Sequence, residues 1–135
     1  MAVGGASMAL AMLIGIAPSA HAGTMTSNVS GKVSQDASYI VYGTDAYWHA
    51  SDANLVTIKL TEGVDVFPVN GVVFKVRNQA TGLSSSWSAP LNVNFTIHDS
   101  TASWIRPQGY YFLDAHRENT CSIACDNTWA GMFTR

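Results

Sequence analysis

Apolar and polar residues alternate along much of this chain with a period of two. Residues 91–98 alternate without exception, and residues 55–60 and 72–77 repeat the pattern. Successive side chains of a β-strand point to opposite faces, so strict alternation indicates a strand that is buried on one side only. The face of residues 91–98 that we expect to be buried carries Leu91, Val93, Phe95 and Ile97.

Further strands are predicted where β-branched and aromatic residues gather between turn-forming residues. Three such runs are residues 38–42, 110–113 and 129–133, and weaker ones lie at 29–33 and 65–69. No long run after position 22 combines helical periodicity with a good capping residue. The sequence therefore predicts an all-β domain.

Turn signals separate these runs at regular intervals. Asn70-Gly71, between two apolar runs, is the strongest hairpin signal in the chain, and positions 62–63, 81–82 and 107–109 mark further turns. Short strands with turns between them are typical of a sandwich or a small barrel. We expect an immunoglobulin-like or fibronectin-like β-sandwich, with a small β-barrel as the alternative.

A local resemblance supports the sandwich. Residues 78–95 contain Ser-Trp-Ser-Ala-Pro followed by an alternating apolar run. This segment of 18 residues resembles the last hairpin of a fibronectin type III domain, in which the strand after a Ser-Trp-Ser-x-Pro stretch completes a sheet. The resemblance implies an immunoglobulin-like fold and names no ligand or activity.

Residues 1–22 have the pattern of a secretory signal peptide. An apolar run over residues 8–16 is followed by Pro18 and by the small-x-small end Ala20-His21-Ala22. The run is shorter than the roughly 20 residues that a membrane-spanning helix needs. We therefore expect a secreted protein, extracellular or periplasmic, in which residues 23–135 form a single domain.

Charge is scarce in this sequence. Lys and Arg number 7 and Asp and Glu number 9, which gives a formal net charge of −2, and charged residues make up only 12% of the chain. No basic run or basic amphipathic helix is present, so neither a nucleic-acid partner nor stable membrane insertion is expected. A surface rich in Ser, Thr, Asn and Gln instead favours neutral hydrogen bonding to an extracellular protein or glycan.

Cys121 and Cys125 are the two cysteines of the chain. An oxidising compartment favours their pairing, and the small loop that they close adds roughly 2 kcal/mol of stability. Two cysteines are too few for a structural zinc site. We predict a structural disulfide and no cofactor.

Aromatic residues on polar loops are the main candidates for ligand binding. Trp48, Trp87 and Trp104 each stand in a stretch of small or polar residues. An aromatic ring on such a loop can stack on a sugar or anchor a protein partner, or it can fold back and fill the end of the sandwich. We predict that Trp48, Trp87 and Trp104 bind ligand, supported by Tyr47 and Asn54.

Three histidines offer an alternative site. His49, His98 and His116 each lie close in sequence to an Asp, and an imidazole oriented by a carboxylate suits a metal ligand or a general base. Their spacing matches no known ligand motif, so metal binding depends on their convergence in the fold.

The sequence predicts a secreted, non-catalytic recognition domain, such as an adhesin, a toxin-binding subunit or an effector that docks on a host protein or glycan. One alternative is an enzyme inhibitor that inserts the loop closed by Cys121 and Cys125 into an active site. The other is a small metal-dependent enzyme that uses the three histidines. No nucleophile elbow, phosphate loop or recognisable carboxylate pair indicates a reaction. The oligomeric state stays open.

Overall fold

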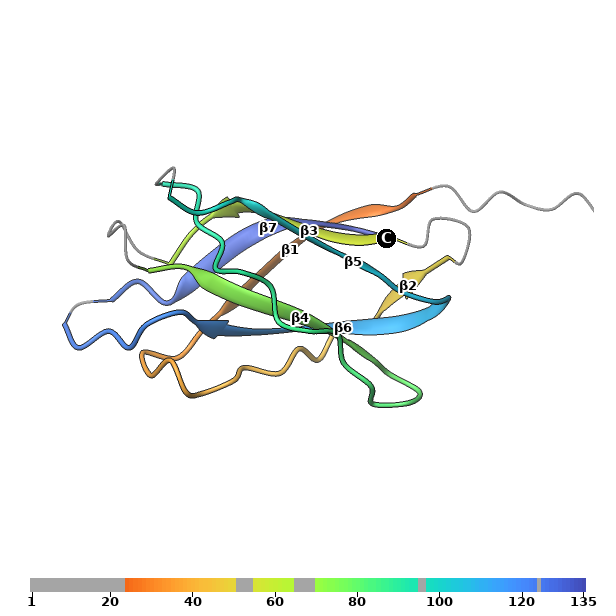
Figure 1. Cartoon of the computed structure of the whole chain (residues 1–135), viewed down its shortest axis with the longest axis horizontal. Helices are drawn as coiled ribbons and strands as arrows, with labels where there is room; N and C mark the ends of the chain where they lie inside the picture. The colour runs from red at the N-terminus through yellow and green to blue at the C-terminus, as the bar shows by residue number, and fades with distance from the viewer. Residues whose placement is uncertain (1–23, 51–54, 65–69, 95–96, 124) are drawn as a thin grey trace, which may run out of the picture.

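Two antiparallel β-sheets lie face to face in this protein (Figure 1). The computed structural model describes residues 24–50, 55–64, 70–94, 97–123 and 125–135, and within these ranges it contains no helix. The strands are β1 (Thr26–Lys32), β2 (Tyr47–His49), β3 (Leu55–Glu62), β4 (Val72–Asn78), β5 (Thr101–Ile105), β6 (Gly109–Arg117) and β7 (Thr128–Thr134). The all-β sandwich expected from the alternation is confirmed.

The order of the strands joins distant parts of the sequence. One sheet has the order β1-β7-β3-β5 and the other β2-β6-β4. The first strand therefore lies beside the last, and β2 beside the last strand but one. An immunoglobulin-like sandwich instead places its first strand next to its second.

Residues 84–91, which we call the return segment, run back along the free edge of β4. They form isolated bridges to it at both ends, Arg77 with Ser84 and Val72 with Leu91. Between these ends, the hydroxyls of Ser85 and Ser88 accept hydrogen bonds from backbone amides of β4, each at 3.0 Å. Serine side chains thus complete an irregular pairing at the edge of the second sheet.

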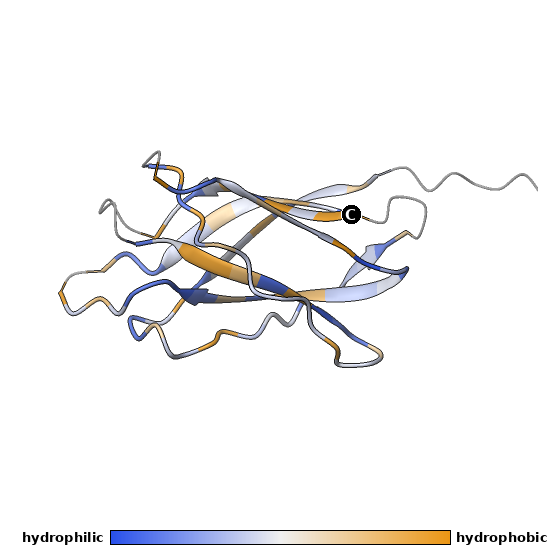
Figure 2. Cartoon of the chain, viewed as in Figure 1, coloured by the Kyte–Doolittle hydropathy of each residue, from blue (hydrophilic) through white to orange (hydrophobic). Residues whose placement is uncertain are grey.

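The core lies between the two sheets and follows the predicted alternation on β3 and β4. Val56 and Ile58 of β3 and Phe74 and Val76 of β4 are fully buried. The apolar stretch of β4 stands out in Figure 2. Phe74 packs edge-on against Trp129 of β7, with ring centroids 4.9 Å apart, which joins one sheet to the other.

The prediction of a strand over residues 91–98 is wrong where the structure describes them. Leu91 is buried, but Val93 and Ile97 are exposed, and Phe95 lies outside the described residues. The cause is Asn92, which is buried and whose side-chain amide donates a hydrogen bond to the carbonyl of Asn70. Its side-chain oxygen accepts the amide of Asn94 at 2.7 Å, so the chain turns after one strand-like residue.

The remaining predictions of strands and turns were confirmed only in part. Residues 38–42 form only a bridge between Val41 and Ala115, and residues 65–69 lie outside the described part of the chain. Gly71 lacks the positive φ that a two-residue Asn-Gly hairpin turn requires, so that turn is not made. The turns at 81–82 and 107–109 are confirmed, whereas the short or polar strands β2 and β5 were missed.

Replacing Gly43 with Ala tests the packing of the second sheet. A Cβ at this position would overlap the backbone carbonyl of Leu113 on β6, and a backbone atom cannot move aside cheaply. We expect G43A to lower the free energy of unfolding by about 2–3 kcal/mol, measured by urea denaturation. G63A is the control, because its nearest atoms lie at 3.6 Å and its stability should be unchanged. Equal stability of the two variants would contradict this packing.

Candidate functional site

Two exposed aromatic rings lie together on the outer face of the second sheet. Trp48 of β2 and Tyr110 of β6 are opposite each other in the antiparallel register. Their ring centroids are 4.9 Å apart, and the residues are 37% and 49% exposed. Their neighbours His49 and Tyr111 point to the opposite side and are buried. Because side chains alternate along a strand, Trp48 and Tyr110 therefore face the solvent.

A hollow of about 600 Å³ opens beside this pair. It lies between Trp48 of β2, the hairpin after β4, and the turn between β5 and β6. Its polar and aromatic lining includes Trp48, Asn78, Gln79, Arg106, Gln108 and Tyr110. No acidic residue is among the described residues that line it. A size of this order is typical of small-molecule sites in proteins.

Two buried side chains support the turn between β5 and β6 from beneath. His49 Nε2 lies 3.0 Å from the carbonyl oxygen of Arg106, and the Tyr111 hydroxyl donates to the carbonyl of Pro107 at 2.9 Å. A carbonyl can only accept, so the His49 Nε2–H is the donor in this hydrogen bond. The backbone that presents Arg106 and Gln108 is therefore held in place from inside the sandwich.

The hairpin on the other side of the hollow is also fixed. Asn78 Oδ1 accepts the backbone amides of Ala80 and Thr81, both at 3.0 Å. Gly109 packs against the same asparagine, because a Cβ there would lie 2.8 Å from Asn78 Nδ2. The two turns thus meet at Asn78, which sets the width of the hollow.

Cations and aromatic rings alternate over the rest of this outer face. Lys75 Nζ lies 4.5 Å from the ring centroid of Trp87, which in turn packs edge-on against His116 at 4.6 Å. The guanidinium of Arg77 lies 4.6 Å from the ring centroid of Phe112. Trp87 is therefore engaged by neighbours of its own, at a distance along the sheet from Trp48.

Arg77 is held by a buried carboxylate. Asp114 is fully buried on β6, and its oxygens lie 2.9 Å from Arg77 Nε and 3.1 Å from Nη2. The hydrogen bond to Asp114 raises the pKa of Arg77, and burial opposes this only in part. The carboxylate also accepts the amide of Gly43 at 3.0 Å. This ion pair serves the structure of the sheet.

The remaining predicted ligand-binding residues lie elsewhere. Trp104 is buried in the core, and its indole donates to the carbonyl of Ser86 at 3.1 Å, so it fills the sandwich and offers no ring to a ligand. Tyr47 points inward and lines a separate cavity of about 180 Å³. Burial, and secondarily the charge of Asp45, raises the pKa of Tyr47. Asn54 lies outside the described residues.

The three histidines have three different surroundings. His49 is buried beneath a turn, His98 Nε2 lies 3.1 Å from a carboxylate oxygen of Glu118, and His116 bonds the carbonyl of Arg117 at 2.7 Å. Over the described ranges, no three His, Cys, Asp or Glu side chains are grouped so as to hold a metal ion.

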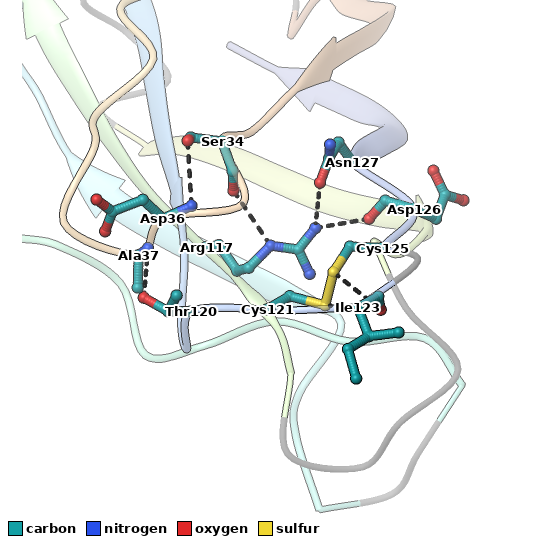
Figure 3. The surroundings of a disulfide bond; sticks show 10 residues. All are labelled: Ser34, Asp36, Ala37, Arg117, Thr120, Cys121, Ile123, Cys125, Asp126 and Asn127. Atoms are coloured by element: carbon teal, nitrogen blue, oxygen red, sulfur yellow. Dashed lines mark hydrogen bonds between the residues drawn. A yellow bond between two sulfur atoms is a disulfide. The ribbon is translucent and has the colours of Figure 1, made fainter.

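The disulfide between Cys121 and Cys125 closes a loop at the opposite end of the sandwich (Figures 1 and 3). Ile123, which lies within this loop, is 81% exposed. The base of the loop surrounds Arg117, which is fully buried. Arg117 donates to the carbonyls of Ser34 and Asp126 and to the side chain of Asn127, at 2.7–3.2 Å (Figure 3).

Sequence reasoning missed Tyr110 and Arg106 as site residues. Tyr110 was predicted only as part of a strand, and no role was predicted for Arg106. A usable signal was present, because the turn at 107–109 stands between an Arg and a pair of tyrosines. What alternation cannot give is the register that places Tyr110 opposite Trp48.

No protein-family model, curated protein or solved structure matches this chain. None of the residues in the described ranges belongs to a helix that could cross a membrane. The geometry of the hollow is therefore the basis for a functional proposal.

Removing Arg117 should cost more stability than removing the disulfide. R117M leaves a buried cavity and removes the donor from two carbonyls and an amide oxygen, and we expect a loss of about 3 kcal/mol or more. The double variant C121S/C125S opens only a small loop and should lose about 2 kcal/mol. Urea denaturation of both variants measures the difference. A larger loss in the cysteine variant would show that Arg117 does not organise this end of the sandwich.

Proposed function

We propose that this chain is a non-catalytic recognition domain that binds a glycan in the hollow beside Trp48 and Tyr110. The exposed pair of aromatic rings, tilted at 59° to each other, is the observation that carries the proposal. An aromatic face suits the apolar face of a sugar ring, and the amides of Asn78, Gln79 and Gln108 suit its hydroxyls. Binding would need little rearrangement, because the turns on both sides of the hollow are already fixed by hydrogen bonds.

We further propose that the sandwich is a jelly roll and not the immunoglobulin-like arrangement expected from the sequence. When the return segment is counted as a strand between β4 and β5, the pairs are nested. β1 pairs with β7, β2 with β6, β3 with β5, and β4 with the return segment. This nested pairing supports the winding of a jelly roll, a fold that includes lectin and capsid domains. The likeness to lectins is an analogy of fold and does not identify a ligand.

Export of the protein is part of the proposal. The signal-like pattern of residues 1–22, which lie outside the described part of the chain, and the paired cysteines support it. An extracellular or periplasmic location would bring the hollow into contact with glycans.

Loss of the Trp48 ring should abolish glycan binding. We expect W48A to lose the signals that the wild-type protein gives on a glycan array, because the stacking surface is gone. W87A is the matched control, since Trp87 lies on the same face but away from the hollow, and its signals should be retained. Undiminished binding by W48A, or equal loss in both variants, would place the site elsewhere.

An enzyme inhibitor is a second candidate function, favoured by the exposed Ile123 on a loop with a rigid base. A side chain presented in this way can fill a specificity pocket of an enzyme. If so, excess protein inhibits one member of a panel of secreted proteases and lysozymes, and I123A loses the inhibition. I105A is the control, because Ile105 is similarly exposed, at 77%, on β5. Absence of inhibition across the panel, or equal inhibition by I123A, rejects this candidate.

A further inference from the structure

Arg106 differs from the other guanidinium groups of the chain. Arg77 is paired with Asp114, Arg117 with the loops around the disulfide, and Arg135 donates to Ser27 at 2.9 Å. In the part of the chain that the structure describes, no hydrogen bond or ion pair engages the Arg106 guanidinium. Its Nε is buried without a partner, so this nitrogen has lost its hydrogen bonds to water without gaining one within the protein.

The surroundings of Arg106 suit an anion. Its side chain lines the hollow together with Trp48 and Gln108, and the described lining holds no carboxylate that would neutralise it. The guanidinium is partly removed from water, and the described lining supplies no negative charge to neutralise it. Its attraction to an anion in the hollow is therefore stronger than it would be in open solvent. Because the planar guanidinium offers parallel N–H groups, a carboxylate is a well-matched partner.

The backbone at Arg106 is fixed before any ligand arrives. Its carbonyl is bonded by His49, and the next carbonyl along the turn is bonded by Tyr111. Both of these side chains are buried, so the turn is anchored to the interior of the sandwich. A cation carried on a preorganised turn beside an aromatic pair defines two points of contact on one ligand.

We propose that the hollow selects acidic saccharides, with the sugar ring on Trp48 and its carboxylate on Arg106. This inference rests on the proposed glycan binding and specifies its ligand class, which includes sialic and uronic acids. Neutral saccharides would use the aromatic pair alone and bind more weakly. Lys75 and Arg77 lie on the same sheet face but are engaged by Trp87 and Asp114, so they do not supply the selectivity.

Calorimetric titration with matched pairs of saccharides tests the proposal. The probes are sialyllactose against lactose, and a glucuronic-acid disaccharide against its glucose counterpart. We expect the wild-type protein to bind the acidic member of at least one pair roughly ten-fold more tightly, in keeping with one charge-assisted hydrogen-bonded pair. This preference should shrink as salt is raised from low to physiological concentration.

Substitution of Arg106 then assigns the preference to this residue. R106Q should lose the preference and bind the acidic and neutral members of a pair with equal affinity, and R106K should be intermediate. K75Q, the matched control, should keep the full preference. Circular dichroism and thermal melting check that each variant is folded. If R106Q does not fold, R106K tests the proposal in its place, and its preference should be smaller than that of the wild-type protein.

The outcomes separate this inference from the function on which it rests. Equal binding of acidic and neutral members by the wild-type protein, or a preference that survives in R106Q, overturns the role of Arg106 but leaves glycan binding intact. A preference for sulfated over carboxylated analogues overturns the carboxylate assignment. If no saccharide of either kind binds, the proposed function fails and this inference fails with it.

Discussion

The pairing of β6 with a strand on each side is the constraint on which the rest of this structure depends. Its inward residues join the core, while its outward residues form the face that carries the candidate site. At its start, Tyr110 meets Trp48 across the register with β2, and at its end Arg117 organises the loops around the disulfide. A slip of one residue would send Tyr110 inward and expose Tyr111, which would destroy both the core and the hollow.

Burial of polar groups shapes this molecule as much as burial of apolar ones. Asp114, Arg117, Asn92 and His49 are almost fully removed from solvent, and each bonds backbone groups of loops or turns. Inside the protein an unmade hydrogen bond is costly, so each bond that these buried side chains make helps to specify a single geometry. Most of the other charged side chains that the structure describes are exposed, among them Asp36, Asp45 and Glu62.

The sequence predicted β3 and β4 from their alternation, because apolar burial there dominates local preference. It predicted parts of β1, β6 and β7 from their β-branched and aromatic residues. It failed at residues 91–98, where the side chain of Asn92 competes successfully with the sheet for backbone groups. It missed β5 because Thr101 and Ser103 look like loop residues, although Trp104 between the sheets is what holds that strand. Of the site, Trp48 was predicted, but its partnership with Tyr110 depends on strand register, which no local pattern encodes.

The central claim is that the turns on either side of Trp48 and Tyr110 form one preorganised binding surface. The most direct test is to follow backbone amide chemical shifts by NMR while a mixture of neutral and acidic oligosaccharides is added to the wild-type protein. The account predicts that changes are confined to Trp48, residues 78–83 and residues 106–111. Changes centred on the disulfide loop, or no changes at saturating saccharide, would contradict it.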